Sequence, residues 1–269
     1  LIGLTFSVYA QSPKLPHLFY GTSKANGIDT PTGTVIIAKF NGIEKGRYTT
    51  VETGKYGGAT EKKLVVQNTT DGSTIEFFVS KVKANQTAIF DSSEIDELNL
   101  TWVFPDEISF QGNIANEPIL CVPGTDIENS NSGLTIVINC DEASAATIKN
   151  VSNLGTGFFV GAPVPGGLEE LSSVFEISIT GDVEIIVTMS YDDTGIDEST
   201  ITIYKFNGVA WVPIPSADII SRDTAANKIT FKVSPGGTPY TVFGSVPAPP
   251  APSAGGAAAG AGGGGGGGC

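Results

Sequence analysis

The stretch TVIIAKF at residues 34–40, followed by Asn41-Gly42 and by RYTTVE at residues 47–52, decides the fold class. Both runs are rich in β-branched and aromatic residues, which favour extended strands. Asn-Gly between two such runs predicts a hairpin, because both residues tolerate the positive φ angles that a tight turn requires. Helix signals are nearly absent from the rest of the chain, so the pattern predicts an all-β protein.

The same alternation of apolar and polar residues continues along the chain and predicts two tandem antiparallel β-sandwich domains, at residues 18–104 and 105–245. Asp71-Gly72 marks a further tight turn in the first domain. Residues 141–149 (DEASAATIK) are the one short helix candidate. Strands 174–180 and 183–191 are expected to be joined at Gly181-Asp182. Strands 200–206 and 210–214 are expected to form a second Asn-Gly hairpin. The full set of other expected strands is 63–67, 74–81, 87–90, 98–103, 134–139, 174–180, 183–191, 200–206, 210–214, 228–233 and 240–243.

Composition restricts the class of partner and the location. The 269 residues include 28 acidic and 15 basic side chains, which give a net charge of −13. Such a chain is a poor ligand for nucleic acid or for anionic membrane surfaces. No segment approaches the ~20 consecutive apolar residues of a membrane span. The abundance of Thr, Ser, Gly and Val is typical of an extracellular β protein, and we expect that location.

The two ends of the chain differ from its middle. Residues 246–269 begin with a Pro/Ala-rich stretch and end in seven glycines and Cys269, which predicts a stiff spacer followed by a flexible arm that carries a thiol. An engineered or disordered tail is the alternative interpretation. Residues 1–17 form a leader-like segment: LIGLTFSVYA at 1–10 resembles the end of a signal peptide. Its apolar residues also alternate, so a retained segment would be a β-strand that could complete a neighbouring subunit's sheet.

The three cysteines predict one bonded pair and one remaining thiol. Cys121 and Cys140 lie nineteen positions apart, and a bridge between them would contribute about 3 kcal/mol. Cys269 is then the odd thiol, which in a secreted chain suggests an intermolecular cross-link. The alternative is three buried, reduced cysteines.

The remaining candidate sites are a group of acidic residues, four glycosylation sequons and a single histidine. Hard oxygen ligands make the acidic group a weak calcium candidate, against the alternative of a solvated acidic turn; no other cofactor is expected. His17 has no second His or Cys near it in sequence, so we expect it to pack rather than to catalyse. The acidic group is Asp192, Asp193, Asp197 and Glu198, and the sequon asparagines are Asn68, Asn85, Asn99 and Asn150.

Several phrases of the sequence resemble known surface proteins. Five segments of the first domain resemble the transthyretin-like or carboxypeptidase-regulatory-like β-sandwich of archaeal surface proteins. They are LFYG at 18–21, PTGTVIIAK at 31–39, GKYG at 54–57, LVVQ at 64–67 and GSTIEFFV at 72–79. Three segments of the second domain are similar to the β-rich domain that often follows this sandwich in such proteins. They are VTMSYDDTGIDES at 187–199, IYKFNGVAW at 203–211 and YTVFG at 240–244. The tail departs from the usual membrane anchor and resembles the sheath proteins of filamentous methanogens.

This resemblance implies a structural subunit of a sheath or surface layer, which assembles with identical copies through strand edges and is cross-linked by disulfides. The second hypothesis is a surface-displayed adhesin module that binds carbohydrate or protein. An enzyme is the weakest of the three, because no nucleophile, phosphate-binding or dinucleotide-binding motif is present in a meaningful context.

Overall fold

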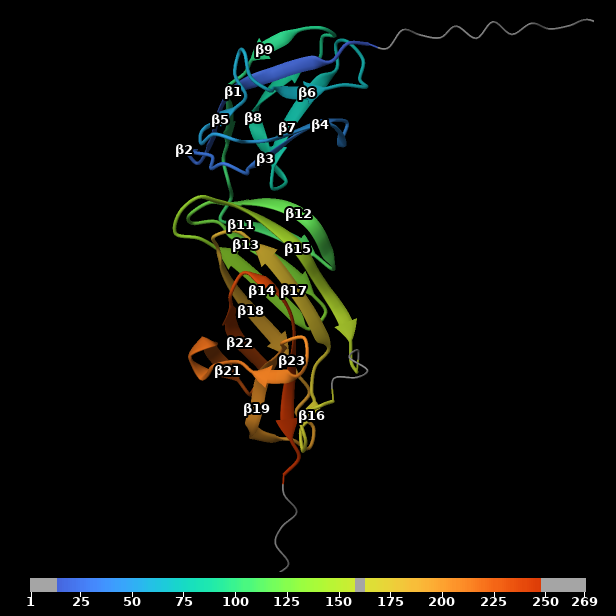
Figure 1. Cartoon of the computed structure of the whole chain (residues 1–269), viewed down its shortest axis with the longest axis vertical. Coiled ribbons are helices and arrows are strands. Elements are labelled where there is room, and N and C mark those ends of the chain that lie inside the picture. Colours follow the sequence, from blue (N-terminus) through green and yellow to red (C-terminus); the bar gives the residue numbers. More distant parts are fainter. Residues whose placement is uncertain (1–13, 158–162, 248–269) are drawn as a thin grey trace, which may run out of the picture.

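The computed structural model describes residues 14–157 and 163–247, and these residues form an all-β structure. Within them there are 23 strands, a 3-10 turn at Ser216–Asp218 and no α-helix, which confirms the predicted fold class. The strands fall into two groups along the long axis of the molecule (Figure 1). We call residues 14–104 the N-terminal half and the described residues from 105 onward the C-terminal half.

The N-terminal half is organised around β1, which pairs with five short strands, and around a four-stranded sheet in the order β4-β3-β7-β8. Asn41 and Gly42 join β3 to β4 with φ angles of 51° and 76°, as the predicted hairpin requires. Phe19, Phe77 and Trp102 are buried between the strands. The strands are β1 (His17–Ala25), β2 (Ile28–Asp29), β3 (Val35–Phe40), β4 (Ile43–Thr49), β5 (Lys55–Tyr56), β6 (Leu64–Val66), β7 (Thr74–Val79), β8 (Val82–Ile89), β9 (Ile95–Glu97) and β10 (Leu100–Trp102).

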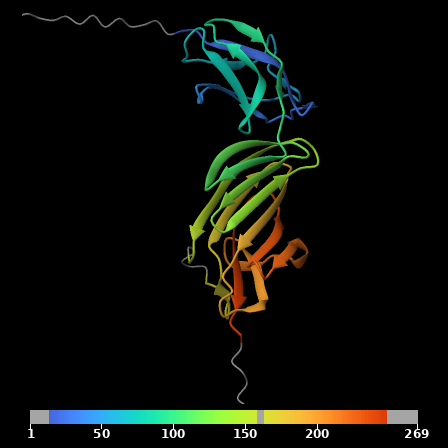
Figure 2. The same ribbon diagram turned by 180° about the vertical axis from the view of Figure 1, so that it is seen from behind.

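The C-terminal half consists of two sheets, seen from behind in Figure 2. Their strand orders are β11-β13-β14-β18-β22-β21 and β12-β15-β17-β23-β19-β20. Side chains alternate between the core and the outside, so that each sheet has one apolar face to bury. The strands are β11 (Glu107–Gln111), β12 (Ile114–Cys121), β13 (Asp126–Asn131), β14 (Leu134–Asn139), β15 (Ser144–Gly155), β16 (Glu169–Glu170), β17 (Val174–Thr180), β18 (Glu184–Ser190), β19 (Asp197–Phe206), β20 (Trp211–Pro213), β21 (Ile219–Asp223), β22 (Lys228–Val233) and β23 (Gly236–Ser245).

The helix expected at residues 141–149 is wrong. Most of that segment belongs to β15, which pairs with β12 on one side and with β17 on the other. Ala, Glu and Lys favour a helix locally, but Ala146 and Ile148 alternate with more exposed residues and are buried in the core. Tertiary pairing on both edges therefore outweighs the local helix preference.

The structure adds detail to two expected connections. The strands on either side of Gly181-Asp182 do not pair with each other, because β17 lies in one sheet and β18 in the other. The chain crosses between the sheets at Gly181, whose close approach to Ala146 leaves no room for a side chain. The second Asn-Gly hairpin is present, but its loop runs from Asn207 to Ala210, and the Asn207 side chain accepts hydrogen bonds from the backbone N–H groups of Val209 and Ala210.

The pairing is mostly, but not entirely, antiparallel. β1 runs parallel to both β9 and β10, and β11 runs parallel to β13. Each of these pairs is separated by intervening strands or a long connection, as parallel pairing requires. The first strand begins at His17, one residue before the domain boundary expected at residue 18.

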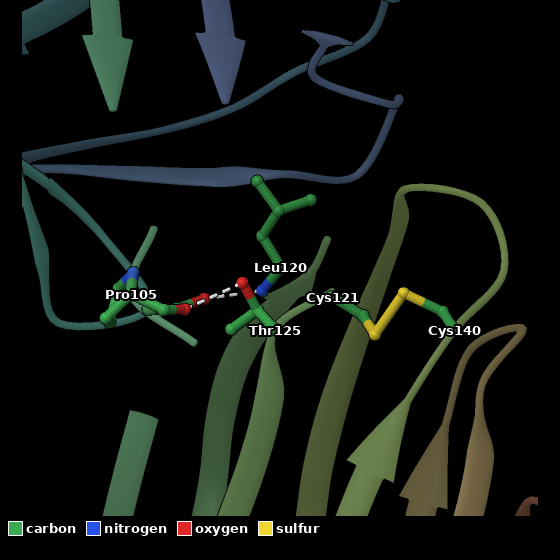
Figure 3. Close-up of a disulfide and its surroundings, with 6 residues drawn as sticks. Pro105, Leu120, Cys121, Thr125 and Cys140 are labelled. Atoms are coloured by element: carbon green, nitrogen blue, oxygen red, sulfur yellow. Dashed lines mark hydrogen bonds between the residues drawn. A yellow bond between two sulfur atoms is a disulfide. The ribbon is translucent and has the colours of Figure 1, made fainter. Parts of the chain in front are cut away.

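The tip of the β7–β8 hairpin joins the two halves. Ser80 and Lys81 both have positive φ, and the buried Ser80 Oγ accepts the backbone N–H of Leu120 in β12. The Lys81 ammonium lies 3.5 Å from the centroid of the Phe110 ring. The connecting segment is held at both ends, since Asn26 accepts the N–H of Phe104 and the Thr125 hydroxyl donates to the carbonyl of Pro105 (Figure 3).

Candidate assembly edges and cross-link sites

An exposed strand edge carries unpaired N–H and C=O groups that can pair with another chain. In the N-terminal half, one edge strand, β4, is covered by β6. The Gln67 N–H donates to the Lys45 carbonyl at 3.1 Å, and the Lys45 ammonium donates to the Asn68 carbonyl at 2.8 Å. Gly46 permits this approach, because an added Cβ would overlap the Val65 carbonyl.

The other edge strand of that sheet, β8, is covered by β10 through a side chain rather than through a backbone ladder. The Gln86 side-chain carbonyl accepts the Thr101 N–H at 2.8 Å, and its amide donates to the Thr101 hydroxyl at 2.9 Å. Asn85 donates to the same hydroxyl at 3.1 Å. The main edges of the N-terminal half are thus satisfied within the chain.

The C-terminal half has more edge strands, and most carry features that discourage pairing with another chain. β20 is three residues long and includes Pro213, while β21 is irregular between Ile219 and Ser221. On β12, Pro118 lacks an N–H and the N–H of Leu120 is already bonded to Ser80. Short length, proline and bulges are the devices by which β proteins protect their edges.

β11 carries none of these features. Its five residues pair without interruption with β13, and they include neither Pro nor Gly. Ile108 and Phe110 are buried, whereas Glu107, Ser109 and Gln111 are exposed. Within the described residues, β11 is therefore the strand whose outer edge is best suited to accept another strand. The expected strands did not include it, although its period-two alternation, EISFQ, is the signal that could have revealed it.

The structure places the predicted cysteine pair together. Cys121, at the end of β12, and Cys140, which follows β14, are joined by a disulfide with a Cα–Cα distance of 6.1 Å (Figure 3). The bond links the two facing sheets, because β12 and β14 belong to different ones. Cys121 is fully buried. Cys269, residues 1–13 and most of the Pro/Ala spacer lie outside the described residues.

The four sequons differ in how accessible the asparagine amide is. Asn68 is exposed and has a φ of 57° in a bend. Asn85 and Asn99 are also exposed, but Asn85 donates to Thr101 and Asn99 accepts from Thr22. Asn150 is half-buried in β15, and its amide donates to Glu176 at 2.8 Å. Glycosylation at all four stays a prediction.

The four acidic calcium candidates are used largely to shape loops. Asp192 accepts hydrogen bonds from Thr194, and Asp197 accepts them from Ser199. These bonds, chiefly those from the two hydroxyls, lower the pKa of both carboxyl groups. Asp193 accepts from the Asn227 amide at 3.0 Å. Among residues 14–157 and 163–247, no three His, Cys, Asp or Glu side chains gather closely enough to hold a metal, so Glu198 and its neighbours do not form one cluster there.

His17 is a packing residue in the structure. Its ring is 1% exposed, stacks on Phe19 with 4.0 Å between ring centroids, and lies 3.0 Å from an Asp96 carboxylate oxygen through Nε2. Nδ1 accepts the backbone N–H of Asp91. Both ring nitrogens thus tie β1 to the segment around β9.

Burial perturbs a few other titratable groups. It raises the pKa of Tyr56, whose hydroxyl donates to the Leu98 carbonyl, and that of the partly buried Glu170. The Gly157 N–H partly offsets the effect on Glu170. These two groups lie in different halves of the molecule.

Comparison of the chain with protein-family models, with curated proteins and with solved structures finds no match. In the part of the chain that the structure describes, no helix has the length and apolar character needed to cross a bilayer.

Proposed function

We propose that the chain is a structural subunit of an extracellular envelope, a sheath or surface layer, which assembles with identical copies. The observation that carries this proposal is the distribution of strand edges. The N-terminal half has its main edges satisfied internally, while β11 presents an uninterrupted edge without Pro, Gly or bulge. An edge of this kind is a template for pairing with another β chain.

The envelope role also draws on the composition and on the phrases that resemble archaeal surface and sheath proteins. Backbone hydrogen bonds between subunits would supply stiffness, and a Cys269 cross-link between subunits would resist dissociation. Forming that link joins two thiols and releases two protons and two electrons, which an oxidant such as a small-molecule disulfide accepts. The internal Cys121–Cys140 bond is consistent with an oxidising compartment.

Assembly of the purified chain tests the proposal. With oxidised glutathione as electron acceptor, we expect high-molecular-weight species in light scattering, ordered assemblies in electron micrographs and a ladder on non-reducing gels. Mass spectrometry of unreduced digests should then contain a peptide that joins Cys269 of two copies.

The matched control is Cys269→Ser, which leaves the internal disulfide in place. This variant should lose the covalent ladder, and its assemblies should dissociate at lower denaturant concentration. A wild-type chain that stays monomeric under all of these conditions contradicts the envelope proposal. If such a monomer gains thermal stability with a carbohydrate or protein ligand, the adhesin hypothesis takes its place.

A further inference from the structure

The hydrogen-bonding direction of each β11 residue follows from the ladder with β13. The Asp126 N–H donates to the Asp106 carbonyl, and the Gly112 N–H donates to the Ser130 carbonyl, each at 2.8 Å. In a parallel pair, alternate residues of one strand bond to the neighbour. Residues 106, 108, 110 and 112 therefore face β13, and the N–H and C=O groups of 107, 109 and 111 point outward.

These outward groups have no partner among the described residues. Glu107, Ser109 and Gln111 are exposed, and no described backbone or side-chain group bonds to their main-chain atoms. Lys81 approaches β11 over the ring of Phe110, not at the outer main chain. Glu107, Ser109 and Gln111 therefore leave three backbone N–H donors and three C=O acceptors, one of each at every second residue.

We propose that β11 pairs with β11 of a second copy, antiparallel and about a two-fold axis through Ser109. This inference rests on the proposed function and identifies one of its contacts. In this register Ser109 faces Ser109 of the second copy, and Glu107 faces Gln111. All three outward residues then form hydrogen-bonded pairs, which use every free N–H and C=O of both strands.

The side chains fit the same register. Each Glu107 carboxylate meets the Gln111 amide of the other copy on the outer face, so a hydrogen-bond acceptor faces a donor twice. On the inner face, Ile108 of one copy faces Phe110 of the other, and the buried apolar layer continues across the junction. A symmetric interface of this kind needs the same patch to be complementary to itself, and β11 meets that condition.

Long-range charge opposes the contact and makes it dependent on salt. Each copy carries a net charge of −13, so two copies repel each other at low ionic strength. The screening length falls from about 30 Å at 0.01 M to about 3 Å at 1 M salt. Dimer formation through β11 should therefore tighten as salt is added.

Two different two-fold contacts on one subunit produce a chain of subunits when each contact is made with a different copy. The β11 pair is one such contact, and a Cys269–Cys269 link, as proposed above, is the other. Copies joined alternately by strand pairing and by tail linkage form an extended polymer.

Cysteine trapping tests the pairing in a Cys269→Ser background, which removes the tail link. Residues in a hydrogen-bonded antiparallel pair have Cα atoms about 5.5 Å apart, within disulfide range. Ser109→Cys should therefore give a disulfide-linked dimer with oxidised glutathione. The matched control is Ser221→Cys, because Ser221 is also an exposed serine on an edge strand, β21, at the opposite edge of the same sheet. Equal or absent dimer formation by the two variants overturns the proposal.

A second set of variants tests the register by sedimentation equilibrium at about 0.15 M salt, where the screening length of about 8 Å weakens long-range repulsion but leaves close charge pairs. Gln111→Lys faces Glu107 and should tighten the dimer about fivefold, whereas Gln111→Glu should weaken it by a similar factor. Ser109→Pro removes an outward N–H without touching the β13 ladder and should leave monomers. Unchanged dimerisation in all three overturns β11 pairing.

The outcomes separate this contact from the envelope function. Wild-type assembly that survives Ser109→Pro leaves the envelope proposal standing and rejects the β11 contact. Cross-linking of β11 to residues 1–10 of another copy also rejects it, in favour of a donor strand. A wild-type chain that never assembles rejects both.

Discussion

At the scale of single residues, the closure of the N-terminal half depends on a few positions where atoms approach closely. Gly46 is one of them, because its missing side chain lets β4 lie against the Val65 carbonyl of β6. Its φ angle is not in the left-handed region, so backbone freedom is not the reason for glycine here. Space is the reason.

Gly46→Ala is expected to destabilise the protein by about 1–3 kcal/mol, because the new methyl group forces the two strands apart. Chemical denaturation monitored by tryptophan fluorescence measures the change. The matched control is Gly166→Ala, since Gly166 has open space around it and also lacks a positive φ. It should change stability by less than about 0.5 kcal/mol. Equal effects of the two substitutions would contradict the steric explanation.

At the scale of strands and sheets, hydrogen bonds from one side chain can join two strands that share no backbone ladder. Gln86 bridges β8 and β10 by accepting the Thr101 N–H and donating to the Thr101 hydroxyl. This bridge satisfies an edge that would otherwise be open to other chains. β11 has no such bridge, which is why the assembly proposal concerns that strand.

Gln86→Ala should cost about 1–3 kcal/mol, because the Thr101 N–H loses its partner in a partly buried position. Urea unfolding measures the loss, and hydrogen exchange at the Thr101 amide should become faster. Thr87→Ala serves as the control on the same strand, since Thr87 is exposed. An unchanged exchange rate at Thr101 in the Gln86 variant would rule out the bridge.

At the scale of the whole molecule, the two halves are joined by more than a linker. The β7–β8 tip bonds to Leu120, and the adjacent residue Cys121 is bonded to Cys140 in the opposite sheet. The contact between halves and the covalent bond between sheets thus meet at the same end of β12 (Figure 3).

Removing the internal disulfide by Cys121→Ala with Cys140→Ala should lower the free energy of unfolding by about 3 kcal/mol, from the loop that it closes. Urea unfolding with and without reductant measures this. In the Cys269→Ser background, which removes the tail link, reductant should destabilise the chain that keeps the internal disulfide, and it should leave the chain that also carries Cys121→Ala and Cys140→Ala unaffected. A wild type that is insensitive to reductant would contradict a stabilising role for the bond.

Prediction from the sequence succeeds where the structure depends on local chemistry. The Asn41-Gly42 turn, the strand at 174–180 and the Cys121–Cys140 pair were all predicted as they occur, whereas the strand after that turn is Ile43–Thr49 and not the expected 47–52. The helix at 141–149 was wrong because its neighbours β12 and β17 determine its conformation. β11 was missed because it carries only two apolar residues, Ile108 and Phe110, so its alternation is hard to distinguish from that of a polar loop.

The candidate assembly edges and cross-link sites also include some features that the sequence predicts and others that arise only when the chain folds. Cys269, the sequons and the acidic loop are recognisable from residue types, and the sequence alone determined them as candidates. Which edges are covered could not be predicted, because Gln86 meets Thr101 and Gly46 meets Val65 only after the chain folds.

The sequence by itself determined the all-β class, the turns and the lopsided charge, because strand preference, positive φ and charge belong to the residues themselves. Tertiary structure alone decided which strands pair, which sheet each joins and which edge stays open. Backbone hydrogen bonds are the same for every residue with an N–H, so partner choice depends on how the apolar faces are buried together.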